Sequence, residues 1–201
     1  MTDTTTDADE SPATEHRRVA AAFTERVRGT ATLDWDAPAP VAGWRARDVV
    51  RHLVEWFPAF LHAGAGVTLP TGPAVDDDPV AAWQVQTDGV QAVLDDPDTT
   101  SRTLRNPHIG ELPLDLAISR FYTADVFLHT WDLARATGQD ETLDAQVCAR
   151  MLAGMEPMDE LLRASGQYGP RVTVAEDADP QTKLIAFIGR DPRPGGSAPP
   201  S

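Results

Sequence analysis

The sequence predicts a mainly α protein: an antiparallel four-helix bundle with a short hairpin before the fourth helix and a small C-terminal α/β addition. Three observations support this prediction. Apolar residues recur at helical spacing in four long segments. The connections between these segments are not long enough to divide two domains. The chain of 201 residues, 41% of them hydrophobic and 24% charged, is sufficient to bury the core of a soluble domain.

The first two helices are marked by their caps and by their apolar faces. The first is expected to begin at Ser11-Pro12, a capping side chain followed by proline at the first helical position, and to end near Gly29. The second is expected over residues 45–62. The apolar face of the first helix comprises Val19, Phe23 and Val27, and that of the second comprises Val49, Leu53, Val54, Phe57, Phe60 and Leu61.

The third and fourth helices follow a second capping sequence and a turn. The third helix should open at Asp78-Pro79. Turn residues within residues 101–112 predict a short hairpin. The fourth helix is the longest, over residues 113–137, and Gly138 is its expected C-terminal stop.

The C-terminal part should contain short elements. A fifth helical segment over residues 144–164 is expected to be kinked near Pro157, because proline interrupts helical hydrogen bonding. Residues 172–174 favour one short strand, and residues 179–188 favour a closing helix.

Both ends of the chain have the composition of tails. Residues 1–10 are acidic and residues 191–201 are rich in Pro, Gly and Ser, so neither is expected to be ordered. Residues 11–190 are then expected to form one helical-bundle domain.

The net charge and composition of the chain limit the classes of partner that it is expected to bind. The chain has 17 basic and 31 acidic residues and a formal net charge of −14. Such a surface repels phosphate backbones and anionic headgroups, so we expect no nucleic acid and no membrane partner. The sequence has no long apolar span and no secretory signal pattern, and its single cysteine, Cys148, fits a reducing compartment. We therefore expect a cytoplasmic monomer or homodimer.

The fourth helix carries a carboxylate on its apolar stripe. At about 100° per residue, Leu114, Ile118 and Leu128 fall within about 60° of Asp125, and His129 lies about 40° away. Burial of an unpaired carboxylate costs several kcal/mol, so Asp125 needs a cation. Either a Lys or Arg on a facing helix or a metal ion would supply it. The Asp-x-x-x-His spacing places two donor groups one turn apart, which suits one metal ion.

A third donor is expected from the second helix. His52 borders its apolar face and would point inward if the second and fourth helices are neighbours. His52, Asp125 and His129 would then form a site with two imidazoles, one carboxylate and open positions. Zinc is the expected ion, and nickel, iron and manganese accept the same donors. The alternative is that the inward histidines are core residues satisfied without a metal.

Several other polar residues have two interpretations. Glu55, three residues after His52, is the candidate catalytic residue as a proton shuttle, or else a solvated charge. Asp132 either accepts a hydrogen bond from a ligand histidine or has a structural role, as a helix cap or as the partner of an arginine. Cys148 is interpreted as a small buried residue rather than a nucleophile. Three further histidines are expected at the surface: His16, His62 and His108.

Two motifs resemble those of a known family. Residues 44–53 contain W-x-x-x-D-x-x-x-H, and residues 123–134 contain D-x-x-x-H-x-W-D-L-A. Together they resemble the mycothiol-dependent maleylpyruvate isomerase metal-binding family, which belongs to the DinB-like four-helix bundles. The segments 178–180 and 188–192 are similar to an actinobacterial branch described only as metal-binding.

The resemblance implies a site and an activity. It assigns His52, Asp125 and His129 to the family's three metal ligands, although the isomerase itself has Glu at the position of Asp125 and a larger C-terminal lobe. It implies a metal-dependent transferase or isomerase that uses mycothiol or a similar small-molecule thiol on a small electrophilic substrate. The alternative is a non-catalytic metal-binding or small-molecule-binding protein that sequesters or senses its ligand.

Overall fold

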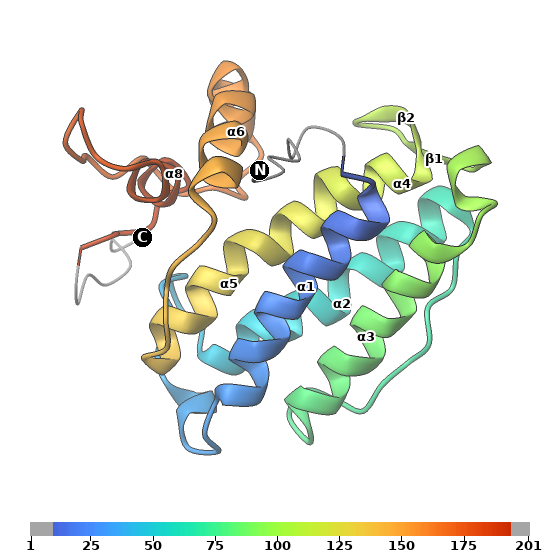
Figure 1. Ribbon diagram of the computed structural model, residues 1–201, viewed down its shortest axis with the longest axis horizontal. Helices are drawn as coiled ribbons and strands as arrows, with labels where there is room; N and C mark the ends of the chain where they lie inside the picture. The colour runs from blue at the N-terminus through green and yellow to red at the C-terminus, as the bar shows by residue number, and fades with distance from the viewer. Residues whose placement is uncertain (1–9, 194–201) are drawn as a thin grey trace, which may run out of the picture. The chain divides into compact units, whose positions relative to one another are not determined.

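The computed structural model describes residues 10–193, which are mainly helical with one small two-stranded sheet, consistent with a helical bundle (Figure 1). Contacts divide these residues into two compact units: unit 1 comprises residues 10–29 and 50–129, and unit 2 comprises residues 30–49 and 130–193. The predicted tails lie outside the described residues apart from Glu10 and residues 191–193. The prediction of one domain over residues 11–190 stays a prediction.

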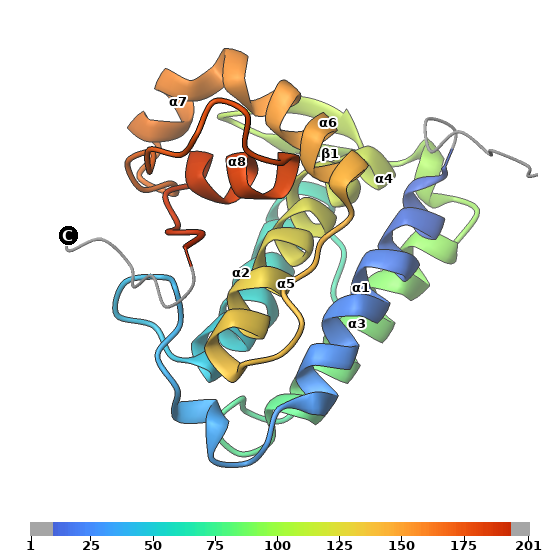
Figure 2. The same cartoon turned by 60° about the vertical axis from the view of Figure 1, so that its left-hand side comes forward.

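Unit 1 contains the predicted long helices at nearly the predicted positions. They are α1 (Pro12–Gly29), α2 (Ala46–Ala65, which enters this unit at Val50) and α3 (Pro79–Asp95). The α3 cap is as predicted, because the Asp78 side chain accepts a hydrogen bond from the Ala81 N–H at 2.9 Å. α1 packs along α3, as Figures 1 and 2 both show.

The predicted hairpin is present in unit 1. β1 (Thr103–Asn106) pairs antiparallel with β2 (Gly110–Pro113), with Thr103 opposite Pro113 and Asn106 opposite Gly110. Gly110 has a φ of 79°, a left-handed conformation that glycine adopts without a Cβ clash. The turn residues therefore locate this hairpin correctly.

The helix predicted over residues 113–137 is present over residues 114–137, but it is not a regular α-helix throughout. α4 (Leu114–Ala117) leads into η4, a π-helix over Ile118–Thr123, and only then into α5 (Ala124–Thr137). A π turn closes at i+5 instead of i+4, so it shifts the residues after it by about 100° relative to a continuous α-helix. Leu114 and Ile118, before this shift, therefore do not share one continuous helical face with Asp125 and Leu128, after it. Gly138, with a φ of 67°, follows α5 as predicted.

His16 is also placed differently from the prediction. It was expected at the surface, yet it is fully buried, whereas His62 and His108 are exposed. The reason is its spacing: His16 precedes Val19 by three residues and Phe23 by seven, so it lies on the apolar face of α1. Its Nδ1 atom is 2.9 Å from the Thr123 hydroxyl oxygen.

Unit 2 contains the short elements. They are η2 (Asp34–Asp36), the C-terminal part of α5, α6 (Ala145–Met155), η5 (Glu156–Met158), α7 (Asp159–Ala164) and α8 (Pro180–Phe187). α6 packs against α8, as Figure 2 shows. The break between α6 and α7 falls at Pro157, as predicted.

The expected strand over residues 172–174 is absent, so the C-terminal addition is helical and irregular rather than α/β. The Val172 N–H bonds to the Ala186 carbonyl oxygen at the end of α8 instead of to a neighbouring strand. An isolated extended segment has no ladder to join, which explains the difference.

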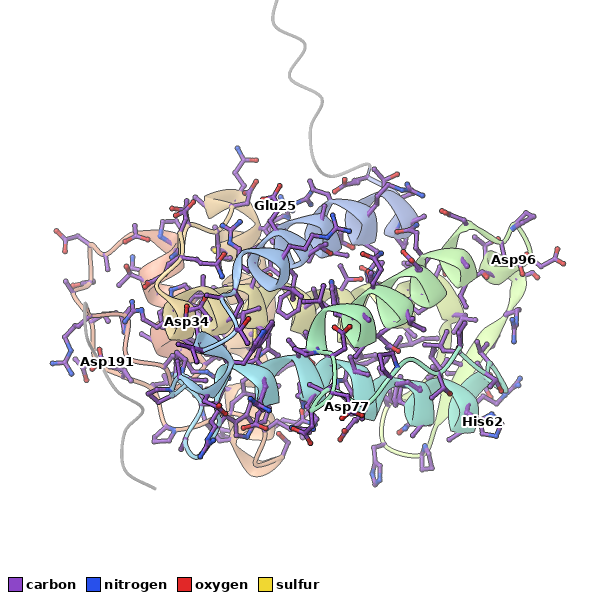
Figure 3. The ribbon with its side chains drawn as sticks, turned by 90° about the horizontal axis from the view of Figure 1, so that it is seen from below. Glu25, Asp34, His62, Asp77, Asp96 and Asp191 are labelled. Atoms are coloured by element: carbon purple, nitrogen blue, oxygen red, sulfur yellow. The ribbon has the colours of Figure 1, made fainter. Side chains whose placement is uncertain are left out.

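The surface of unit 1 is rich in exposed acidic side chains, among them Glu25, Asp77 and Asp96, which stand at its outside in Figure 3. Within residues 10–193, every helix is too short or too polar to cross a membrane.

Candidate metal centre

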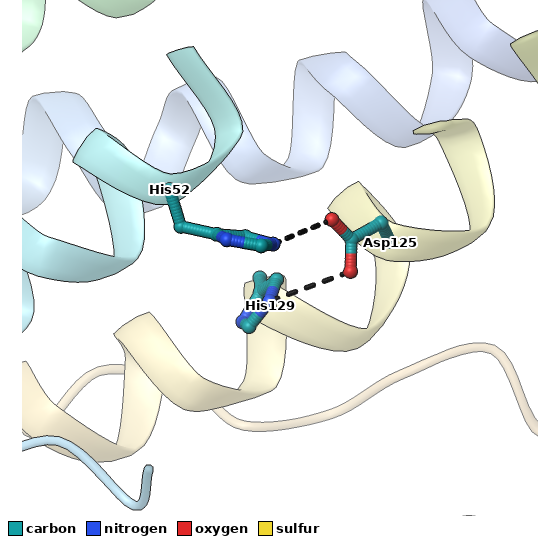
Figure 4. A group of neighbouring side chains, drawn as sticks. All are labelled: His52, Asp125 and His129. Atoms are coloured by element: carbon teal, nitrogen blue, oxygen red, sulfur yellow. Dashed lines mark hydrogen bonds and ion pairs between the residues drawn. The ribbon is translucent and has the colours of Figure 1, made fainter. Parts of the chain in front are cut away.

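The three predicted ligands meet in unit 1. His52 projects from α2, while Asp125 and His129 project from the same face of α5, because four residues make about one helical turn. Figure 4 shows the two imidazoles turned toward the carboxylate. One ligand atom from each of the three residues can be chosen so that all lie within 4.8 Å of one another. The structure thus brings together the set that the sequence singled out.

Each oxygen of the carboxylate faces a different imidazole. His52 Nε2 lies 2.9 Å from Asp125 Oδ2, and His129 Nε2 lies 3.4 Å from Asp125 Oδ1. The two imidazole centroids are 4.9 Å apart. The side chains of His52 and Asp125 keep 32% and 23% of their surface exposed, so the cluster is open to solvent on one side, whereas His129 is buried.

A fourth residue, Trp56, orients the carboxylate. Its indole N–H donates a hydrogen bond to Asp125 Oδ2 at 3.1 Å. Sequence analysis did not predict this bond. The available signal was its spacing, because Trp56 follows His52 by four residues and therefore shares its face of α2.

The electrostatics favour an ionised carboxylate. Burial by itself raises the pKa of Asp125, but the imidazoles of His129 and His52 and the Trp56 N–H together hold it below its ordinary value of 3.8. Among the described residues, no guanidinium or ammonium group pairs with Asp125. The cation that the sequence argument required is therefore not an arginine or lysine of residues 10–193.

The donor set fits a divalent metal ion. Two imidazole nitrogens and one carboxylate are ligands that zinc accepts, and other first-row metals accept them too. With ligand bonds of about 2.0–2.2 Å, neighbouring donors around a tetrahedral ion lie roughly 3.4 Å apart. The 3.4 Å between His129 Nε2 and Asp125 Oδ1 matches this spacing, whereas the 2.9 Å between His52 Nε2 and Asp125 Oδ2 is a hydrogen-bond distance that would lengthen around an ion. Three protein donors would leave further coordination positions for water or substrate.

The other candidates have different surroundings. Glu55 is exposed on α2, and its catalytic role stays a prediction. In unit 2, Asp132 is fully buried and pairs with Arg190, whose Nε and Nη2 atoms lie 3.2 and 3.1 Å from its two oxygens. Of the two interpretations of Asp132, the structure supports pairing with an arginine.

Cys148 on α6 is fully buried. Burial, and to a lesser degree the charges of Asp144 and Asp179, together raise the pKa of its thiol to about 12. A thiol in this state is a weak nucleophile at neutral pH, which agrees with its interpretation as a small buried residue.

Comparison with known proteins agrees with the geometry. Two curated relatives, the uncharacterized proteins MT0763 and Rv0738 of Mycobacterium tuberculosis, are each 29% identical to the chain over 184 residues, which cover 90% of this chain and 99% of the relative. No solved structure matches the chain. Residues 16–134, which include all three candidate ligands, match the mycothiol maleylpyruvate isomerase N-terminal domain. The chain belongs to the mycothiol maleylpyruvate isomerase N-terminal domain family.

Proposed function

We propose that this protein binds a divalent metal ion and uses a small-molecule thiol of the mycothiol type to transfer or isomerise a small electrophilic substrate. The observation that carries the proposal is the convergence of His52, Asp125 and His129, with ligand atoms within 4.8 Å, in a chain of this family. The proposal includes the DinB-like four-helix arrangement for the domain.

Three side chains would coordinate the ion, and a fourth would orient one of them. His52 and His129 would supply imidazole nitrogens, and Asp125 would supply one oxygen. The Trp56 N–H donates to Asp125 Oδ2, the same oxygen that faces His52, and this hydrogen bond limits the rotation of the carboxylate. When bound, such an ion acts as a Lewis acid that lowers the pKa of a thiol beside it. Zinc is the ion we favour for this donor set.

Neighbouring residues suit an apolar electrophile. Trp56, Phe60 and Phe121 are only partly buried, and their rings form a row, with centroids 5.6 Å apart for Trp56 and Phe60 and 5.9 Å apart for Phe60 and Phe121. This row adjoins Asp125 through the Trp56 hydrogen bond. We propose that it packs against the substrate, and that exposed Glu55 passes the thiol proton to solvent.

The experiment combines the zinc-loaded full chain with mycothiol and a panel of small electrophiles. We expect thiol-dependent consumption of at least one electrophile above the metal-free background, and loss of that consumption in Asp125→Asn. An exposed-histidine variant, His108→Ala, is the matched control and should retain activity. Failure to consume any electrophile would contradict the enzymatic proposal, and stoichiometric metal without thiol affinity would favour the sequestering or sensing alternative.

A further inference from the structure

The helix that carries two of the three candidate ligands begins with an irregular segment. The π-helix η4 ends at Thr123, two residues before Asp125. Because its turns close one residue later than α turns, it changes the direction of every following side chain by about 100° relative to α4. The directions of Asp125 and His129 therefore depend on this segment being kept.

Two side-chain contacts join η4 to α1. The Thr123 hydroxyl oxygen lies 2.9 Å from Nδ1 of His16, and both residues are buried. The Ser119 hydroxyl donates to Glu15 Oε2 at 2.5 Å. Glu15 and His16 are adjacent in sequence, so a single turn of α1 contacts η4 near its start, at Ser119, and at its end, at Thr123. A buried hydrogen bond of this kind favours one rotation of a helix over others, because breaking it leaves polar atoms unpaired.

A third contact joins η4 to the helix that carries His52. The Tyr122 hydroxyl donates to the carbonyl oxygen of Leu53, the residue directly after His52, at 3.2 Å. The Tyr122 ring is fully buried and stacks on Phe57 with a centroid distance of 4.0 Å and an interplanar angle of 11°. Tyr122 thus connects the backbone next to His52 with η4, the segment that sets the directions of Asp125 and His129.

We propose that Thr123 and Tyr122 are positioning residues for the metal centre. Their hydroxyl groups hold the π segment against α1 and α2, and this fixes the rotation at which Asp125 and His129 face His52. The inference rests on the proposed function, because its readout is metal binding. Removing a group that orients metal ligands typically weakens metal affinity by roughly 10- to 100-fold.

The experiment measures Co²⁺ binding to the metal-free full chain by visible absorption, whose bands report both affinity and coordination geometry. Thr123→Val removes the hydroxyl with little change of shape, and we expect about tenfold weaker binding and altered bands. Thr123→Ser restores the hydroxyl and should bind within about twofold of the wild-type chain. Tyr122→Phe removes the second hydroxyl and should weaken binding in the same direction.

A matched control separates positioning from stability. Thr24→Val removes another hydroxyl of unit 1, one that accepts from the Trp83 indole N–H and donates to the Ala20 carbonyl. It should lower the melting temperature without changing the Co²⁺ bands. If Thr123→Val no longer unfolds cooperatively, its metal affinity cannot be interpreted, and the Co²⁺ affinity of Tyr122→Phe then tests the inference.

Wild-type affinity and bands in both Thr123→Val and Tyr122→Phe would overturn this inference alone. Absence of Co²⁺ binding by the wild-type chain would overturn the proposed function and this inference with it. Equal weakening in Thr24→Val would also overturn the inference, because the loss would then follow general stability.

Discussion

Two aspartates on α5, seven residues apart, have contrasting surroundings. In unit 2, Asp132 is fully buried and Arg190 donates to both of its oxygens. In unit 1, Asp125 keeps 23% of its side chain exposed and is faced by two imidazoles and one indole N–H. A bidentate guanidinium supplies a full charge and occupies the carboxylate, whereas imidazoles can share a metal ion with it. The partners of the two aspartates therefore differ, and we expect Asp132 to stabilise the fold and Asp125 to bind a metal ion.

The largest effect should come from breaking the pair in unit 2. Asp132→Ala leaves Arg190 without its carboxylate, and removing one partner of a buried pair typically costs about 3–5 kcal/mol. We expect a loss of this size in the free energy of unfolding, measured by urea denaturation of the metal-free chain. A loss below about 1 kcal/mol would show that Asp132 is not structurally important in the way proposed.

The second effect concerns the aspartate in unit 1. Asp125→Asn should weaken metal binding by more than roughly 100-fold, because it removes a ligand and not merely an orienting group. Its effect on the unfolding free energy of the metal-free chain should stay within about 1 kcal/mol, since the amide oxygen can still accept from Trp56. Competition with a chelator gives the affinity. Metal affinity equal to that of the wild-type chain would refute the ligand role.

A third titratable residue, the buried His16, extends the comparison to the pH dependence of stability. Burial, and to a lesser degree the charge of Arg17, lowers the pKa of His16 from 6.5 to about 4, although the charge of Asp95 acts the other way. The unfolded chain therefore binds the proton more readily than the folded chain between these values. The contribution of His16 to the free energy of unfolding is therefore complete above pH 6.5 and is lost as the pH falls toward 4.

Titration of His16 should lower the free energy of unfolding by about 2 kcal/mol between pH 7 and pH 5. Urea denaturation at several pH values should show this slope in the wild-type chain, and His16→Gln should remove that part of it. An identical slope in both proteins would mean that His16 does not titrate as its burial requires.

The smallest effect is expected at Glu55. Because its side chain is exposed, Glu55→Gln should change the unfolding free energy by no more than about 0.5 kcal/mol. Metal affinity should stay within about twofold of wild type, and a change in thiol turnover alone would support its proposed proton transfer. A large fall in affinity would instead place Glu55 in the ligand set.

Much of the fold was predictable because its signals are local. Proline at the first turn located α1 and α3, Pro157 located the break before α7, and Gly110 helped to locate the hairpin. The π segment was not predictable, because helical spacing assumes a constant turn, and residues 118–123 carry no proline or glycine to mark a change. The strand expected over residues 172–174 failed because strand formation needs a partner that local sequence does not reveal.

The candidate site was predictable in its residues but not in its supports. Asp125 and His129 stood out because polar residues at core spacing are costly, and His52 was added by its place on a second apolar face. The contacts of Trp56, Thr123 and Tyr122 depend on how helices pack, which single-helix periodicity does not contain. His16 was predicted at the surface because it is polar, but its spacing from Phe23 places it on the buried face of α1.

The most direct test of the central claim is the metal content of the purified full chain by elemental analysis, with His129→Ala and the exposed-residue control His108→Ala measured beside it. We predict close to one divalent ion per chain in the wild type and in His108→Ala, and almost none in His129→Ala. A wild-type chain without metal, or a His129→Ala chain that retains as much as the wild type, would contradict the account.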